Sequence, residues 1–491
     1  MTMGVLSDLE PKRVFHYFEE ITKIPHGSGN VRAISDYLVN FAKEHKLSYI
    51  QDEFLNVIIF KDASIGYENE PTLMLQGHMD MVAVHTDDYD ADMKKTPLEA
   101  AVDGDYIYAK GTSLGGDDGI AVAYALAILE SDEIEHPPLE IIITAEEEVG
   151  MDGARGLDMS HLKGMRLLNL DSEKEGEFLT GCAGGGRVLC KLTLPLRISN
   201  GKIWRISIKG LKGGHSGDEI DKGRENSNVL MGRVLSELLD RGIKFELSKL
   251  SGGMADNAIA KSTSAVFILR DEEKSISSPE AVLSDIYGGI KSEICENEPD
   301  FCLLSEGGEE GSEYALDAGD TVSIIGMLRQ FPQGVQAMSR TVPGLVETSL
   351  NMGILELKPD KEKAELKVTF SVRSSITAER DALIDSLKSI ASKYGAITVV
   401  SGLYPGWEFD ESSKLRKKME GVYERLYGEK PKVRAIHAGL ECGLLIEKRQ
   451  GLDCVSIGPD MSGVHTTDER LSISSTRRVW NFLLELLRTR G

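Results

Sequence analysis

The apolar residues of this chain follow two patterns, continuous runs and alternation with polar residues. The difference between these patterns constrains the fold more than any other feature. Before residue 190, short continuous apolar runs at 56–60, 72–75 and 139–144 are bounded by turn residues, and an Ala-rich stretch at 119–129 separates the last two. Continuous runs are typical of strands buried on both faces, and their alternation with helices indicates an α/β sheet. The same pattern returns after residue 401.

The middle of the chain has the alternating pattern. Its apolar and polar residues alternate, as in strands with one solvated face, at 191–196, 202–208, 263–269 and 365–372. We therefore predict an α/β fold in which a discontinuous domain, residues 1–190 and 401–491, has a mixed sheet flanked by helices. An inserted α+β domain of roughly 210 residues fills 191–400. The capping-box spacing of Ser7 and Glu10 predicts that an amphipathic helix opens the chain.

Composition excludes several classes of protein. The 491 residues are 41% hydrophobic and 27% charged, which is ordinary globular usage. The net charge of -23 repels nucleic acid and anionic membranes, and the longest apolar run, 120–129, is too short to span a bilayer. The N-terminus has no signal-peptide pattern, and six cysteines are too sparse for a disulfide scaffold. We expect a cytoplasmic protein with reduced thiols.

Polar residues gather where the predicted buried strands end. His78 and Asp80 follow the 72–75 run and point to the same side, so one could bind a metal while the other orients it; alone, the pair is more often a satisfied polar contact. Asp117 and Asp118 lie in a Gly-rich turn at a helix start, where simple N-capping is the alternative.

Three adjacent carboxylates, 146–148, directly follow the 139–144 strand. Such neighbours should repel one another unless a cation offsets their charge, although a solvated acidic loop is the alternative. Asp171 ends another apolar run, and His465 follows a short strand near the C-terminus. Open α/β sheets place ligand crevices at such strand ends. Mixed imidazole and carboxylate groups favour zinc, with manganese or cobalt as substitutes.

These motifs resemble the M20 family of metallopeptidases, and within it the bacterial aminoacyl-histidine dipeptidases (Xaa-His or β-alanyl-histidine dipeptidases). The resemblance covers essentially the whole chain, including a split catalytic domain and a lid inserted into it. It is carried by segments 76–82, 111–117, 146–151, 437–443 and 465–470.

The resemblance implies a role for each of the polar residues. His78 and Asp171 would hold one zinc ion, Glu148 and His465 the other, and Asp117 would bridge the two. Asp80 would orient His78, and Glu147 would be the general base that takes a proton from a water shared by the metals.

The resemblance also implies roles for three residues of the inserted lid. His215 would stabilise the developing oxyanion, while Asn257 and Arg373 would hold the backbone and C-terminal carboxylate of a dipeptide such as β-alanyl-histidine. We expect a homodimer joined through the lid, with His215 serving its own chain.

Three other interpretations stay open at this point. One is another M20 branch, such as a broad dipeptidase, an aminoacylase or a carboxypeptidase. Residues 111–115 also satisfy G-x-S-x-G, which would make Ser113 the nucleophile of a serine hydrolase with His465 and with Asp171 or Asp453 as partners. A metal-dependent binding protein on a peptidase fold is the non-enzymatic alternative, and Glu147 argues against it because a binding protein needs no base.

Overall fold

The computed structural model describes residues 4–270 and 278–490 and divides the chain into two compact units. The first unit holds Met1–Gly181, Phe409–Ala435 and Leu440–Gly491, and the second holds Cys182–Glu408 with Ile436–Gly439. The insertion thus begins nine residues earlier and ends eight residues later than the sequence indicates. The reason is that residues 184–195 form one continuous strand of the second unit's sheet and residues 397–404 pair with it.

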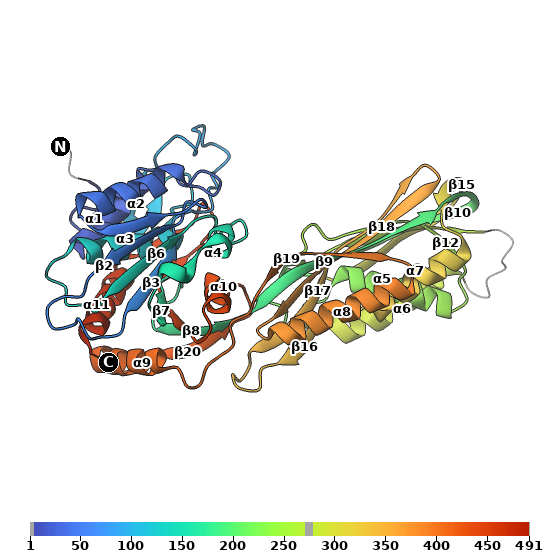
Figure 1. Ribbon diagram of the computed structural model, residues 1–491. Helices are drawn as coiled ribbons and strands as arrows, with labels where there is room; N and C mark the ends of the chain where they lie inside the picture. Colours follow the sequence, from blue (N-terminus) through green and yellow to red (C-terminus); the bar gives the residue numbers. More distant parts are fainter. Residues whose placement is uncertain (1–3, 271–277, 491) are drawn as a thin grey trace. The chain divides into compact units, whose positions relative to one another are not determined.

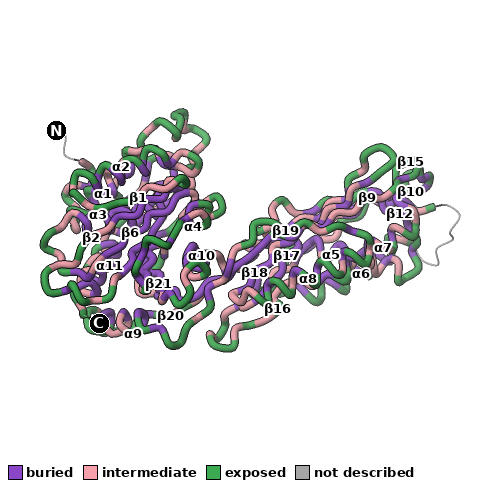
Figure 2. Tube along the Cα trace, in the orientation of Figure 1, coloured by how far each residue is buried: buried purple, intermediate pink, exposed green. Residues whose placement is uncertain are grey.

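The first unit is built on a mixed sheet, which has eight strands among the described residues, in the order β1-β2-β6-β3-β7-β21-β8-β20 (Figure 1). The strands are β1 (Ser48–Gln51), β2 (Val57–Lys61), β3 (Leu73–His78), β6 (Leu139–Thr144), β7 (Arg166–Asn169), β8 (Glu177–Cys182), β20 (Lys432–Ile436) and β21 (Asp453–Ser456). Strands β6, β3, β7 and β21 are parallel, so their carboxyl ends meet at one edge. Strands β3 and β6 are buried along their whole length (Figure 2), which explains their continuous apolar runs.

Helices and a smaller sheet complete the first unit. The helices are α1 (Lys12–Thr22), α2 (Arg32–Glu44), α3 (Gly116–Glu130), α4 (Asp152–Gly156), α9 (Lys414–Tyr427), α10 (Glu441–Lys448) and α11 (Ile473–Arg488), with a 3₁₀ turn at Met159–His161. The smaller sheet contains β22 (Met461–Ser462), β23 (Arg470–Ser472), β5 (Tyr106–Ala109) and β4 (Ala100–Asp103). Helix α3 packs on β3, and its Ala-rich body shares a core with side chains of α1, α9 and α11.

The first helix begins later than the capping-box spacing predicts. Helix α1 starts at Lys12, and no side chain caps it; Pro11 occupies the N-cap position instead of Ser7. Proline lacks a backbone N–H, which is no loss at a helix start, where the N–H groups have no partner within the helix. The residues before Pro11 form turns and bends instead of a helix. The apolar face is nevertheless where the periodicity places it, because Val14, Phe18 and Ile21 are fully buried.

The second unit is an antiparallel sheet with helices packed on it, and its sheet has nine strands over the described parts of 184–404. The strands are β9 (Gly184–Pro195), β10 (Arg197–Lys209), β12 (Glu246–Gly252), β14 (Thr263–Leu269), β15 (Cys302–Ala315), β16 (Gly334–Met338), β17 (Val346–Asp360), β18 (Lys363–Ser374) and β19 (Ile397–Tyr404). The helices are α5 (Ser227–Asp240), α6 (Pro279–Ile294), α7 (Ala318–Gln330) and α8 (Thr377–Lys393). Burial alternates along much of β12 and β14, as the one-sided pattern predicts. A separate ribbon pairs β11 (Gly214–His215) with β13 (Ala258–Ile259).

Within the described residues, none of the helices combines the length and apolar character that crossing a membrane requires.

Candidate metal centre

The parallel strands of the first unit deliver polar side chains to one edge of the sheet. His78 is the last residue of β3, Glu147 and Glu148 follow β6, and Asp171 follows β7. Because these strands are parallel neighbours, the segments that follow them converge. The sequence-based expectation that these residues share one site agrees with their placement.

Asp117 and His465 reach the same place from two loops. Asp117 lies in the first turn of α3, which begins after Gly115 in the left-handed region at φ 70°. A Cβ atom on Gly115 would also lie 2.8 Å from Met81 Sδ, so this turn requires glycine. His465 has φ 64° in the loop after β22, and its side chain is half exposed.

The two oxygens of Asp117 face two different imidazoles. Oδ1 lies 3.1 Å from His78 Nε2, and Oδ2 lies 3.2 Å from His465 Nε2. Asp171 Oδ1 is 3.6 Å from His78 Nε2, and Glu148 Oε1 is 2.9 Å from His465 Nε2. The cluster therefore has two halves, one around each imidazole, with Asp117 between them.

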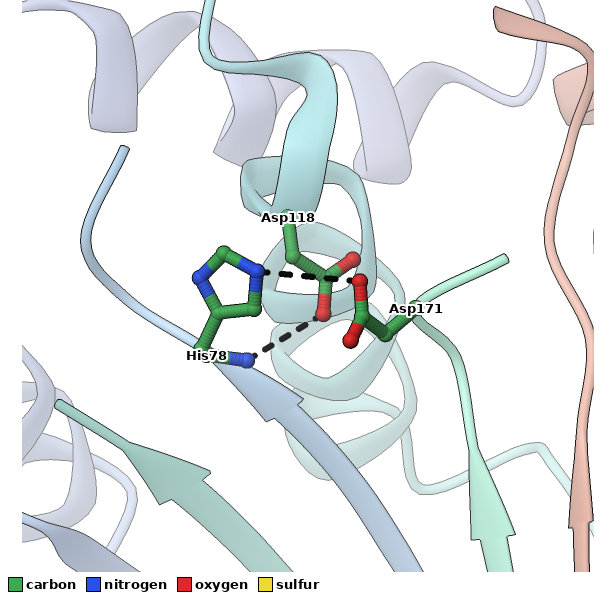
Figure 3. A group of neighbouring side chains, drawn as sticks. All are labelled: His78, Asp118 and Asp171. Atoms are coloured by element: carbon green, nitrogen blue, oxygen red, sulfur yellow. Dashed lines mark hydrogen bonds and ion pairs between the residues drawn. The ribbon is translucent and has the colours of Figure 1, made fainter. Parts of the chain in front are cut away.

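Asp118 also lies in this cluster, and the sequence alone leaves open which carboxylate of the Asp117 and Asp118 pair faces the imidazoles. Figure 3 shows Asp118 on α3 beside His78 and Asp171. Its Oδ2 accepts a hydrogen bond of 3.1 Å from the backbone N–H of His78, and the residue is fully buried. Asp118 thus holds the backbone of His78, whereas Asp117 contacts both imidazole rings.

Protonation equilibria in this cluster are strongly perturbed. Burial, with the Asp117 carboxylate nearby, raises the pKa of Asp171 to about 7. Hydrogen bonds with Asp117 and Glu148 raise the pKa of His465 to about 10. Burial opposes charge on His78, but its hydrogen bonds with Asp117 and Asp171 still hold its pKa well above the ordinary value. These shifts show that the crowded carboxylates need positive charge beside them.

The donor set fits divalent cations. Among the described residues, three groups each offer nitrogen or oxygen ligand atoms within 4.8 Å of one another: His78 with Asp118 and Asp171, His78 with Glu147 and Glu148, and Asp117 with Glu148 and His465. Imidazole nitrogen with carboxylate oxygen suits zinc, manganese or cobalt. Cations would supply the charge that protons supply otherwise.

Asp80 contacts His78, but mainly through its backbone. Nδ1–H of His78 donates to the carbonyl oxygen of Asp80 at 2.9 Å, whereas Oδ1 of Asp80 lies 3.6 Å from that nitrogen. The Asp80 carboxylate instead accepts from the backbone N–H groups of Glu147 at 3.0 Å and Glu148 at 3.3 Å. Asp80 therefore orients both the imidazole and the turn that carries the two glutamates.

Glu147 lies beside His78 and Glu148, and its surroundings disfavour the ionised carboxylate. Burial, together with the negative charges of Asp171, Glu441 and Glu148, raises its pKa well above the ordinary value of 4.5, against the lowering effect of His78. A carboxylate with a raised pKa is a stronger base near neutral pH than an ordinary glutamate.

Two further carboxylates support the site, and neither has an assigned role in the sequence analysis. Glu469 accepts hydrogen bonds from four consecutive backbone amides, those of Leu114, Gly115, Gly116 and Asp117, at 2.7 to 3.4 Å. The sequence signal for Glu469 is its place in the motif at 465–470, four residues after His465. The structure shows that this carboxyl group is buried.

Glu441 is the other buried carboxyl. Its Oε2 accepts from Gln76 Nε2 and from Thr144 Oγ1, both at 2.6 Å, so it links β3 to β6 beneath the cluster. Burial raises the pKa of Glu441 to about 8. Gln76 also accepts from Asn169 Nδ2 at 2.6 Å, which extends the network to β7.

Three residues expected in the lid lie in the second unit. His215 and Asn257 line one cavity of about 410 Å³, with largely apolar neighbours. Arg373 Nη2 is 3.4 Å from His215 Nε2, and Arg373 Nη1 donates to Tyr404 Oη at 3.3 Å. Arg373 is only 7% exposed, and no carboxylate of the described residues lies within ion-pair distance of it. The second unit thus brings His215 together with both other residues, and Arg373 makes no close ion pair among the described residues.

The serine-hydrolase interpretation is wrong. Ser113 is fully buried, and its Oγ donates to the backbone carbonyl of Val82 at 2.7 Å and accepts from Val84 N–H at 3.2 Å. Asp453, one proposed partner, accepts from residues at the start of α9 instead. The glycines around Ser113 build the turn that leads to Asp117.

Comparisons with known proteins agree with this geometry. The chain is 36% identical to the cytosol non-specific dipeptidase of Escherichia coli over 488 residues, which cover 99% of each protein. Its structure matches the crystal structure of aminoacylhistidine dipeptidase from Vibrio alginolyticus with a TM-score of 0.90 and 36% identity, over 99% of this chain and 98% of that one.

A more distant relative has the same fold. Aminopeptidase PepT from Bacillus cereus has a TM-score of 0.60 at 15% identity, over 98% of each chain, and shares the architecture alone. The model of peptidase family M20/M25/M40 matches residues 74–489, which include every residue of the two-halved cluster. The chain therefore belongs to peptidase family M20/M25/M40.

Proposed function

We propose that this chain is a dipeptidase with two zinc ions that prefers dipeptides ending in histidine, such as β-alanyl-histidine. The observation that carries the proposal is Asp117, whose two oxygens each face one imidazole, as a carboxylate shared by two cations would. The names of the relatives from E. coli and V. alginolyticus support cleavage of dipeptides. The word cytosol in the first name supports a cytoplasmic location.

The ligands divide between the two halves of the cluster. His78 and Asp171 would hold one cation, Glu148 and His465 would hold the other, and Asp117 would serve both. When bound there, divalent cations would supply Lewis acidity, which lowers the pKa of bound water toward 7 and polarises a carbonyl group. Manganese or cobalt are substitutes that the same donors accept.

Glu147 acts as the general base. It takes a proton from the attacking water and later gives it to the leaving amine, and its raised pKa suits both directions of transfer. Asp80 keeps Glu147 in position through the backbone N–H of that residue.

The second unit supplies the groups that recognise the substrate. Arg373 is a buried guanidinium that makes no ion pair within the described residues, and its fork suits the C-terminal carboxylate of a dipeptide. His215 donates a hydrogen bond to the developing oxyanion, and Asn257, in the same cavity, holds the substrate backbone.

A hydrolysis panel tests the substrate class. The zinc-loaded protein should cleave β-alanyl-histidine and other Xaa-His dipeptides, and amidation of the C-terminus should raise KM sharply. Equal rates for many unrelated dipeptides would favour a broad dipeptidase, which the word non-specific in the E. coli name supports. A preference for N-acyl amino acids would instead assign the protein to an aminoacylase branch.

We also propose a homodimer joined through the second unit, with His215 serving the metal centre of its own chain. Mixing His215→Ala chains with Glu147→Gln chains tests this. If His215 acts within its chain, every site in a verified heterodimer carries one defect and the mixture stays inactive. Recovered activity would show that His215 crosses to the other subunit.

A further inference from the structure

The turn that carries the candidate base lies between β6 and α4, and its carbonyl groups accept backbone hydrogen bonds from Gly150, Met151 and Asp152 on the α4 side. Glu146, Glu147 and Glu148 follow β6, and Glu146 adopts the left-handed region at φ 57°. A residue other than glycine reaches this region at a cost, so contacts from elsewhere in the chain help to hold the turn in this conformation. Those contacts bear on the orientation of Glu147.

One contact comes from Asp80, which is itself held from a distant segment. Asp80 accepts from the backbone N–H groups of Glu147 and Glu148, and its Oδ2 also accepts from Ser28 Oγ at 2.8 Å. Asp80 is 1% exposed, so water does not replace a missing donor easily. The hydroxyl of Ser28 therefore helps to fix the Asp80 carboxylate, which accepts hydrogen bonds from the turn.

A second contact reaches the turn from the next residue of the same segment. The backbone N–H of Gly29 donates to both carboxylate oxygens of Glu146, at 2.8 and 3.0 Å. Glu146 is the residue with the unfavourable left-handed backbone conformation, and its side chain anchors the turn at that residue.

The segment that makes both contacts is itself fixed to the chain beside Asp80. Gly27 forms a parallel bridge with Met81, Ser28 N–H donates to the carbonyl of Met81, and Met81 N–H donates to the carbonyl of His26. Residues 26–29 thus form a short pairing with the residue that follows Asp80. We call residues 26–29 the brace.

We propose that Ser28 and Glu146 are positioning residues of the hydrolytic reaction: the brace holds Glu147 at the angle at which it accepts the proton of the attacking water. Ser28 acts through Asp80, and Glu146 acts through Gly29. This proposal rests on the proposed function, because it takes Glu147 as the base. Neither residue needs to touch substrate or metal.

Turnover of substitution variants tests the role of Ser28. With β-alanyl-histidine and zinc-loaded protein, Ser28→Ala should lower kcat about 10- to 100-fold, as loss of outer partners of a site typically does, while KM and zinc content stay unchanged. Ser28→Thr keeps a hydroxyl and should recover most of the turnover. Ser35→Ala is the matched control, because it removes a buried hydroxyl that donates to Leu55, and it should leave kcat unchanged.

A pair of substitutions at Glu146 gives an independent arm. Glu146→Gln keeps one oxygen for Gly29 N–H, whereas Glu146→Ala keeps none, so kcat should fall in the order wild type, Gln, Ala. If Ser28→Ala does not fold, this pair decides the question. Wild-type kcat in both Ser28→Ala and Glu146→Ala, or a Ser28→Thr variant as slow as Ser28→Ala, would overturn the proposal.

Hydrogen–deuterium exchange separates failure of the brace from failure of the proposed function. The amides of Glu147 and Glu148 donate to Asp80, so Ser28→Ala should speed exchange in peptides covering 145–150 and Ser35→Ala should not. If the wild type cleaves no dipeptide but this exchange changes as expected, the function is wrong and the brace stands. Unchanged exchange in Ser28→Ala would overturn the brace whatever the activity.

Discussion

Substitution of Glu469 should weaken metal binding, although this residue is not a proposed ligand. Its Oε2 accepts from the amides of Leu114 and Gly115, and its Oε1 accepts from those of Gly116 and Asp117. In Glu469→Gln one oxygen becomes an NH₂ group, so two amides lose their acceptor. At about 1–3 kcal/mol for each buried donor left unpaired, the unfolding free energy should fall by about 2–6 kcal/mol.

The effect on the metal follows because the clamped turn carries Asp117. If the turn loosens, the zinc dissociation constant should rise about 10- to 100-fold, which is the usual cost of disturbing the partners of ligands. Urea unfolding measures the first effect, and competition with a chromogenic chelator measures the second.

Glu140→Gln is the matched control. Glu140 is 4% exposed and accepts from two backbone amides, those of Lys163 and Gly164, at 2.8 and 3.0 Å, near the opposite end of β6 from the cluster. Its substitution leaves one amide unpaired and should cost about 1–3 kcal/mol with no change in zinc affinity. Equal zinc affinity in wild type, Glu469→Gln and Glu140→Gln would refute the reasoning.

Three further predictions follow from the same geometry. Glu147→Gln keeps size but cannot accept a proton, so turnover should fall at least about 10²- to 10⁴-fold at normal zinc content; near wild-type turnover would exclude this base. Arg373→Ala should raise KM for free dipeptides about 10- to 100-fold and leave KM for amidated ones unchanged, and equal effects on both would count against a carboxylate contact. Burial lowers the pKa of His437 from 6.5 to about 4. Between those pH values His437 is protonated in the unfolded chain and neutral in the folded chain. The free energy of unfolding should therefore fall by up to about 3 kcal/mol as the pH drops. In metal-free protein, His437→Gln should flatten this part of a urea-unfolding pH profile, and an unchanged slope would contradict it.

The strands and the cluster at their ends were predictable because they follow from local patterns. The apolar run that ends at Thr144 is buried on both faces, and polar groups after parallel strands must share an edge. The alternating segments were predictable for the same reason, since 263–269 is the strand β14 residue for residue. Period and flanking turns suffice where burial alone decides the structure.

The supporting contacts were not predictable, because they join residues that are far apart in sequence. Ser28 reaches Asp80 across 52 positions, and Glu469 reaches the turn before Asp117 across more than 350. A lone serine or glutamate carries no periodic signal. The start of α1 was misplaced because a capping-box spacing at Ser7 competes with Pro11, and the proline determines where the helix begins.

Metal content measured together with activity tests the central claim most directly. Purified protein, analysed by inductively coupled plasma mass spectrometry, should hold close to two zinc or similar ions per chain. Exhaustive chelation should abolish hydrolysis of β-alanyl-histidine, and added zinc should restore it in proportion to the ions bound. Full activity in protein shown to be free of metal would contradict the account.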